Sequence, residues 1–203
     1  MDKVAEIVRD TNIKIHVDGA RIFNAATALG IPASKLLEHA DSVSVCLSKG
    51  LGAPVGSVIA GKKDFIQRAR RLRKALGGGM RQAGVIAAPA LIALETMSQN
   101  LHIDHNNAKR LAQGLAAMKD LGIQIDPSTV ETNIIMFRLV RDDMTAMEFA
   151  NSLGNPEEGQ KKQVIVKISP KNTQLIRLVT HHQISQEDVD LTLEKMKRIL
   201  SGN

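Results

Sequence analysis

Two short apolar segments that each end on a polar residue place the strongest constraint on the fold of this chain. Residues 13–18 alternate apolar and polar side chains up to Asp18, and residues 42–48 form a second run rich in β-branched side chains. The stretch between them, residues 21–29, has a helical pattern that stops at Gly30. A strand, a helix and a strand in this order predict a βαβ unit in a largely parallel sheet.

The remaining sequence predicts further helices and strands. A third strand over residues 56–61 is followed by a basic helix over residues 63–76, which a triple glycine breaks. The elements expected after it are a helical region in two pieces (82–121, with a bend near 100–106), a strand and turn (122–129), a strand (132–139), a helix (142–154), a polar loop (155–162) and two strands joined by a Pro/Asn turn (163–169 and 173–180).

The last helix is expected to begin at Ser185, with Asp188 in a capping-box position. Its apolar face contains Val189, Leu193, Met196 and Leu200.

These elements predict an α/β chain in two parts. Residues 1–100 are expected to be part of a large α/β domain with a mostly parallel sheet and helices. Residues 101–120 are expected to form a connecting helix, and residues 121–203 a small α+β domain.

Composition narrows the class of protein. The chain has 203 residues, of which 43% are hydrophobic and 24% charged, as is usual for a globular protein. No apolar stretch approaches the roughly 18 residues that a membrane helix needs, and the first residues lack the apolar core of a signal peptide. Cys46 is the only cysteine, which excludes an internal disulfide and favours a reducing compartment; we expect it to pack in the core.

The positive charge of the chain is compatible with an anionic partner. The formal net charge is +6, and residues 68–74 are almost entirely basic. Aromatic residues are only 2% of the chain, which weakens any interpretation that requires nucleic-acid bases to stack on aromatic side chains. We therefore interpret the basic run as the solvated or subunit-facing side of an amphipathic helix, and expect neither a nucleic-acid nor a membrane partner. Nucleic-acid binding is the alternative.

Asp18 and Lys49 stand at the ends of two strands that we expect to be close together. Ligands of open α/β sheets bind beyond the carboxyl ends of the strands, and glycines after Lys49 allow the backbone to approach a bulky group. A desolvated lysine has a lowered pKa and can form a Schiff base, and an aspartate can keep a pyridinium ring protonated. Together they point to pyridoxal phosphate chemistry. Taken singly, Asp18 could be a turn or cap residue and Lys49 an ordinary loop lysine.

Four motifs make the sequence recognisable: HVDGARIFNAATALG, CLSKGLGAPVGS, KALGGGMRQAG and IRLVTH. In this order they resemble the low-specificity threonine aldolases, pyridoxal-phosphate enzymes of the aspartate-aminotransferase-like fold (fold type I). The resemblance implies that Lys49 is the catalytic lysine that carries the cofactor and that Asp18 contacts the pyridine nitrogen. It also implies that Arg21 and Arg177 bind the substrate carboxylate. Arg21 further counts among the cofactor-binding candidates, with Lys74 and Arg81 near the cofactor phosphate or the rim of the site.

The resemblance also implies an enzymatic activity. It implies cleavage of threonine or allo-threonine to glycine and acetaldehyde, in threonine catabolism and glycine biosynthesis, by a cytoplasmic homo-oligomer, a dimer or tetramer, acting on a small amino-acid substrate. A β-eliminating lyase or a serine hydroxymethyltransferase would use the same residue types.

The chain departs from the family in length. Only 17 residues precede Asp18, where family members have many more, including a histidine that stacks on the cofactor. We therefore expect a chain without its N-terminal part that is poorly active alone. The alternative is a non-catalytic remnant or a partner subunit of a longer aldolase.

Histidines offer a weaker signal. His102 and His105 are spaced as two metal ligands can be, but no third ligand is evident, so we expect surface positions at a helix bend and no metal site. His181 follows Arg177 in the last motif and is expected to pack near it.

Overall fold

The computed structural model describes residues 1–156 and 164–202. Two compact units divide the chain, residues 1–101 (unit 1) and residues 102–203 (unit 2). Most of the polar loop expected over residues 155–162 lies outside the described residues, and so does Gln163, where the next strand was expected to begin.

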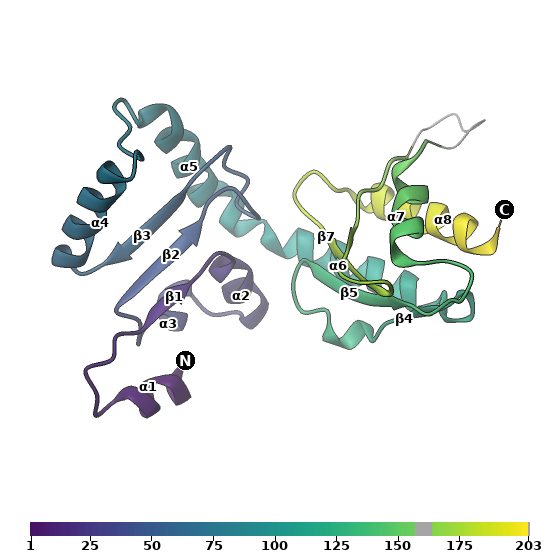
Figure 1. The fold of residues 1–203 in the computed structure, drawn as a ribbon, viewed down its shortest axis with the longest axis horizontal. Helices are drawn as coiled ribbons and strands as arrows, with labels where there is room; N and C mark the ends of the chain where they lie inside the picture. The colour runs from purple at the N-terminus through teal and green to yellow at the C-terminus, as the bar shows by residue number, and fades with distance from the viewer. Residues whose placement is uncertain (157–163, 203) are drawn as a thin grey trace. The chain divides into compact units, whose positions relative to one another are not determined.

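Unit 1 is built on a three-stranded sheet in the order β1 (His16–Asp18), β2 (Ser42–Cys46) and β3 (Ser57–Gly61) (Figure 1). The pair β1–β2 is parallel, which confirms the βαβ unit. The pair β2–β3 is antiparallel, so β3 departs from the parallel arrangement of β1 and β2. The reason is the connection over residues 47–56, which contains no helix and therefore cannot make the crossover that a parallel pair requires.

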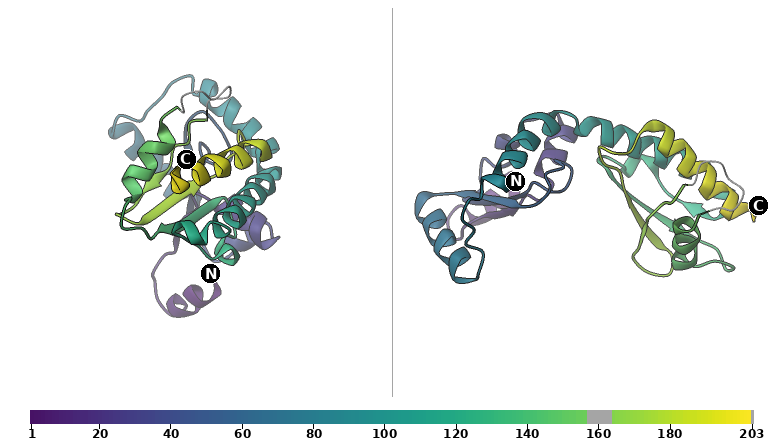
Figure 2. Two further views of the ribbon diagram at one scale, coloured as in Figure 1. Left: turned by 90° about the vertical axis from the view of Figure 1, so that its right-hand side faces the viewer. Right: turned by 90° about the horizontal axis from the view of Figure 1, so that it is seen from above.

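The helices of unit 1 are α1 (Asp2–Val8), α2 (Ile22–Leu29), α3 (Ala33–Leu36), α4 (Lys63–Ala75), α5 (Gly84–Thr96) and the 3₁₀ turn η1 (Met97–Gln99) (Figures 1 and 2). Helices α2, α4 and α5 lie in segments that the sequence predicts to be helical, whereas α1 and α3 were not predicted. Helix α2 ends at Gly30, whose φ of 66° is in the left-handed region that glycine adopts without strain. Residues 97–100 interrupt the helical region of 82–121, slightly earlier than expected.

The two faces of β2 differ in burial. Val43 and Val45 are buried, and they pack with Leu47, Ala90 and Ala93 in the core of unit 1. The alternate residues of β2, Ser42, Ser44 and Cys46, are only partly buried on the other face. The expectation that Cys46 packs in the core is therefore wrong, because the strand alternates and Cys46 falls on the serine side.

Unit 2 contains an antiparallel sheet in the order β4 (Ile123–Gln124), β5 (Ile134–Leu139), β7 (Leu175–Val179) and β6 (Ser169–Pro170) (Figure 1). Of the strand expected over residues 163–169, only its end lies in a strand, and residues 164–168 form none. The backbone of that segment is hydrogen-bonded to helices instead. Val166 N donates to Leu153 O, and Val164 O accepts from the Lys195 ammonium.

Helices cover one face of the sheet of unit 2. They are α6 (Leu101–Ala116), α7 (Ala146–Gly154) and α8 (Gln186–Ser201), with the short turns η2 (Lys119–Leu121) and η3 (Pro127–Thr129). The core contains Phe137 of β5, Phe149 of α7 and Met196 of α8, all almost fully buried. None of the helices in the part of the chain that the structure describes combines the length and the hydropathy required to cross a membrane.

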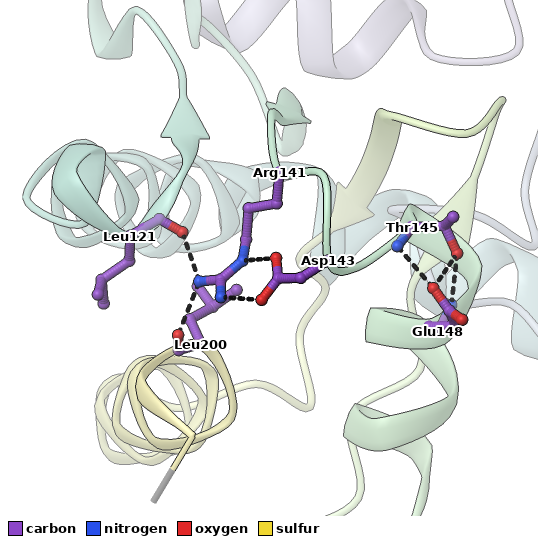
Figure 3. A network of polar contacts seen from close by, with 6 residues as sticks. All are labelled: Leu121, Arg141, Asp143, Thr145, Glu148 and Leu200. Carbon is purple, nitrogen blue, oxygen red and sulfur yellow. Dashed lines mark hydrogen bonds and ion pairs between the residues drawn. The ribbon is translucent and has the colours of Figure 1, made fainter.

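Polar side chains fix the ends of α7 and α8 (Figure 3). Thr145 and Glu148 form a capping box at the start of α7, which explains why this helix begins later than residue 142. Ser185 and Asp188 form the expected box at the start of α8. At the other end of α8, Arg141 donates to Leu200 O (2.7 Å) and forms a bidentate ion pair with Asp143.

Candidate active site

Asp18 is the last residue of β1, and its side chain is exposed. Its Oδ1 accepts a hydrogen bond from Ala20 N at 3.2 Å, which orders the turn into α2. The following Gly19 is pressed against β2: its N–H donates to Ser44 O at 2.8 Å, and a Cβ there would lie 2.9 Å from Val43 Cγ2. This close approach requires glycine and holds Asp18 at the edge of the sheet.

Lys49 lies just beyond the end of β2, in a tight, glycine-rich turn. Its carbonyl accepts from Gly52 N (2.8 Å), and Leu47 O accepts from Ala53 N (2.9 Å). Gly52 has φ of 72° and Gly56 has φ of 111°, which explains why glycine occupies both positions. The Lys49 side chain is exposed, so the desolvation predicted from the sequence is absent around this chain's lysine.

Asp18 and Lys49 follow neighbouring parallel strands at the same edge of the sheet. The register pairs Asp18 with Ser44, and β2 continues from there toward Lys49. The sequence prediction that the two strands are neighbours is thereby confirmed, whereas the roles of the two side chains stay predictions. A carboxylate and a primary amine together at such an edge can hold a cationic ring and an aldehyde.

The other predicted residues are distributed over both units. Arg21 occupies the N-cap position of α2 and is partly buried. Lys74 is the next-to-last residue of α4 and Arg81 precedes α5; both are exposed, and neither side chain forms a hydrogen bond or ion pair within residues 1–156 and 164–202. Arg177 belongs to unit 2, where it lies on β7 opposite Met136 and Ser169, on the sheet face away from the helices.

Sequence reasoning missed a polar face on the sheet of unit 1. His16 Nδ1 lies 2.8 Å from Ser42 Oγ, and Cys46 Sγ lies 3.4 Å from Ser48 Oγ. Burial raises the pKa of the Cys46 thiol, but hydrogen bonds with Ser48 and Ser57 and the charge of Lys49 outweigh it, so that this pKa is lowered. The alternation of serine and valine along β2 was the signal that could have revealed this face.

The histidines of α6 do not both lie on the surface. His102 is exposed, but His105 is 5% exposed, so the expected surface position is wrong for His105. Burial lowers the pKa of His105, and Lys109 and His102 lower it further. His181 lies in the loop after β7, where its Nδ1 accepts weakly from Gln183 N. Among the described residues no group of three or more metal-ligating side chains could hold an ion.

A cavity of about 510 Å³ in unit 2 lies away from the predicted residues. Residues 164–167, the end of β7 and the start of α8 line it, together with His181. Asp18, Lys49 and Arg177 do not line it. The predicted site residues therefore lie apart from this cavity.

Comparison with known proteins identifies the family. A family model described as beta-eliminating lyase matches residues 1–141. The chain belongs to this beta-eliminating lyase family. A relative from Arabidopsis thaliana, named as a probable low-specificity L-threonine aldolase 2, is 48% identical over 200 residues, which are 98% of this chain and 54% of the relative. The chain spans about half the length of the curated relatives it matches.

Solved structures confirm the fold predicted from the sequence. A protein from Exiguobacterium sp. 255-15, titled as a putative aromatic amino acid beta-eliminating lyase/threonine aldolase, matches with a TM-score of 0.79 and 19% identity. The match covers 97% of this chain and 55% of that one. A structure of SPT with PLP matches with a TM-score of 0.65 and 16% identity, over 98% of this chain and 51% of that one. Both likenesses show that this chain shares the fold of about half of each of those chains.

Proposed function

We propose that this chain takes part in pyridoxal-phosphate-dependent cleavage of threonine or allo-threonine to glycine and acetaldehyde. The observation that carries the proposal is the placement of Asp18 and Lys49 at the same edge of a parallel strand pair. The names of the relatives support the reaction class, and the structure of SPT with PLP supports the cofactor.

The residues present fit such a cofactor. The site offers a carboxylate for a protonated pyridine nitrogen, an exposed primary amine for an aldehyde, and the guanidinium of Arg21 for an anionic group. Gly19 and Gly50 are both buried, and a Cβ at either would lie about 3 Å from neighbouring atoms, so the turns that carry Asp18 and Lys49 are closely packed. Lys74 and Arg81 are further cations, which we assign to the cofactor phosphate or the rim.

Each residue has a separate task in the proposed reaction. Bound pyridoxal phosphate supplies an electron-accepting ring that stabilises negative charge at the Cα of the substrate. Asp18 holds a proton on the ring nitrogen, which maintains that capacity. Lys49 would hold the cofactor through its Nζ, the primary amine that can form a Schiff base with an aldehyde. Arg21 binds the substrate carboxylate through its planar fork, and we assign the same task to Arg177. This grip sets the orientation of the Cα–Cβ bond that breaks.

Assembly and location follow the family as proposals. We propose a homo-oligomer, a dimer or tetramer, that acts in the cytoplasm in threonine catabolism and glycine synthesis. Unit 1 favours assembly because it exposes large apolar side chains on several elements, among them Ile59 of β3, Leu76 after α4 and Ile92 of α5.

One observation favours a second candidate function. The chain spans about half the length of its curated relatives, and unit 1 has a sheet of only three strands. It could therefore serve as a partner subunit that is active only beside a full-length aldolase. A chain that remains soluble only when produced with such a subunit would favour this second function.

The test is the product formed from threonine. The purified chain with pyridoxal phosphate, alone and produced with a full-length relative, is assayed for acetaldehyde and glycine. We expect activity to be lost in Lys49→Ala and retained in the matched variant Lys35→Ala, which removes another exposed lysine of unit 1. We expect low activity from the isolated chain. Release of ammonia and a keto acid instead of an aldehyde would contradict the aldolase assignment.

A further inference from the structure

Helix α2 carries a buried amide next to the candidate lysine. Asn24 is the third residue of α2 and is only 3% exposed. Burial of an amide costs stability unless its polar atoms are satisfied, and among the described residues no buried side-chain N or O atom lacks a hydrogen-bond partner. For packing alone, a small apolar residue, which needs no such partner, would be the simpler choice. The neighbouring buried position of the same helix, Ala26, shows that choice.

The side chain of Asn24 lies directly against the turn that begins with Lys49. A Cβ placed on Gly50 would lie 3.1 Å from Asn24 Oδ1 and 3.0 Å from Leu101 Cδ2. Gly50 is buried, and its φ is not in the left-handed region, so the close contact and not the backbone conformation is what disfavours a side chain there. The backbone between Lys49 and Gly50 therefore packs on α2 with no intervening side chain.

A second close approach completes the arrangement. Gly19, next to Asp18, packs on Val43 and on Ser44 O of β2. The turn after β1 is thus pressed on β2, while the turn after β2 is pressed on the helix that follows β1. Interlocked contacts of this kind fix two loops relative to each other, because neither can move without displacing a packed element.

We propose that Asn24 is a positioning residue for Lys49: through its contact with Gly50 it sets where the lysine stands relative to Asp18. This inference rests on the proposed function of Lys49. A site of this kind needs its reacting groups held by supporting residues, and a shift of about 1 Å can cost on the order of 100-fold in rate. Asn24 touches the turn and not the reacting atoms.

The first test needs no cofactor. Hydrogen exchange is measured over residues 47–53 in the unmodified chain, in Asn24→Ala, and in Asn24→Leu, which keeps the branching at Cγ in case the alanine variant folds poorly. We expect several-fold faster exchange in this turn for both variants. The control is Asn151→Ala, an exposed asparagine of α7, for which the turn should exchange as in the unmodified chain. Unchanged exchange in the turn of both Asn24 variants would overturn the proposal.

The second test asks whether the contact governs Lys49 itself. The chain is saturated with pyridoxal phosphate and reduced with borohydride, and the labelled fraction of Lys49 is read by mass spectrometry. We expect less labelling in Asn24→Ala and in Gly50→Ala, and recovery in the double variant, because the added methyl occupies space that the amide left. Loss in the single variants without recovery would indicate a structural role only and would overturn the proposal.

The two tests separate this inference from the proposed function. If Lys49 of the unmodified chain, alone and beside a full-length relative, takes no label, the proposed function fails while the exchange measurement still decides whether Asn24 holds the turn. If Lys49 takes label but the Asn24 variants behave as the unmodified chain in both measurements, the positioning role fails alone.

Discussion

At the scale of single residues, Asp104 of α6 is a buried acidic residue, only 2% exposed. Burial raises the pKa of Asp104, and the smaller effects of His182 and His181 oppose the shift. The folded chain therefore binds more protons than the unfolded chain between the ordinary pKa of an aspartate and the raised one. The contribution of Asp104 to the free energy of unfolding is consequently most favourable at low pH, and it is lost as the pH rises from the ordinary pKa of an aspartate through the raised one.

We predict that Asp104→Asn raises the melting temperature near neutral pH. The amide has the shape of the carboxyl without its charge, and the hydrogen bond from Thr180 Oγ1 goes to the backbone carbonyl of residue 104, so it survives the change. The gain should shrink as the pH falls toward the ordinary pKa of an aspartate, because the raised pKa of Asp104 lets its carboxyl group take up a proton over that range. Melting curves over this pH range test it, and a gain that is constant with pH would contradict the account.

Gly19 gives a second prediction at this scale. A methyl group there would meet Val43 Cγ2 at 2.9 Å and Ser44 O at 3.0 Å, and the backbone oxygen cannot give way. Gly19→Ala should therefore destabilise unit 1 by about 1–3 kcal/mol. Gly84→Ala is the matched control, because its Cβ would meet nothing within 4 Å. Equal denaturation midpoints for the two variants would show that the close approach is not required.

At the scale of elements, the sequence predicts features that depend on neighbouring residues better than features that depend on distant partners. The capping box of Ser185 and Asp188 depends on neighbouring residues alone, so it is readable from the sequence and the structure confirms it. The strand expected over residues 163–169 depends on distant partners. There, the ammonium group of the buried Lys195 of α8 donates hydrogen bonds to the backbone carbonyls of Asn155 and Val164. No local sequence pattern reveals these contacts. The same limit applies to Cys46, whose side of the sheet depends on packing.

Arg141 provides a prediction about how elements are joined. Its Nη1 donates to Leu121 O and Leu200 O, and Asp143 holds the rest of the guanidinium (Figure 3). Lysine cannot reproduce this planar fork. Arg141→Lys should lower the free energy of unfolding of unit 2 by about 1–2 kcal/mol, measured by urea denaturation. Arg138→Lys, on the exposed side of β5, should change it little; equal losses would refute a specific role for Arg141.

At the scale of the whole molecule, the two units differ in how much they bury. Of the twelve largest fully buried side chains in the described residues, all but Leu101 belong to unit 2. Unit 1 instead carries most of the exposed large apolar side chains, among them Val85, Leu91 and Ile92 of α5. Composition and periodicity indicated the fold class, but this imbalance depends on which surfaces meet and could not be predicted from them.

The difference in burial between the two units predicts unequal protection of their backbone amides against hydrogen exchange. Amide hydrogens of β5 and β7 should exchange more slowly than those of β1 and β2, because opening unit 2 exposes the larger apolar core. Native-state hydrogen exchange with peptide resolution tests this. Equal protection in both sheets would contradict the account.

Only part of the candidate site could be predicted from the sequence. The neighbouring strands of Asp18 and Lys49 follow from the βαβ pattern, which the parallel register confirms. The exposure of Lys49 could not be predicted, because it depends on what surrounds the turn. The roles of Arg21, Arg177, Lys74 and Arg81 came from the resemblance alone and stay predictions.

The central claim is that Lys49 anchors pyridoxal phosphate. The most direct measurement reduces the chain with borohydride in the presence of pyridoxal phosphate, alone and beside a full-length relative, and locates the attached cofactor by peptide mass spectrometry. The account predicts that the label is on Lys49, that Lys49→Ala removes it, and that Asp18→Asn weakens it. Label spread over exposed lysines such as Lys35 and Lys63, with Lys49 no more reactive than they are, would contradict it.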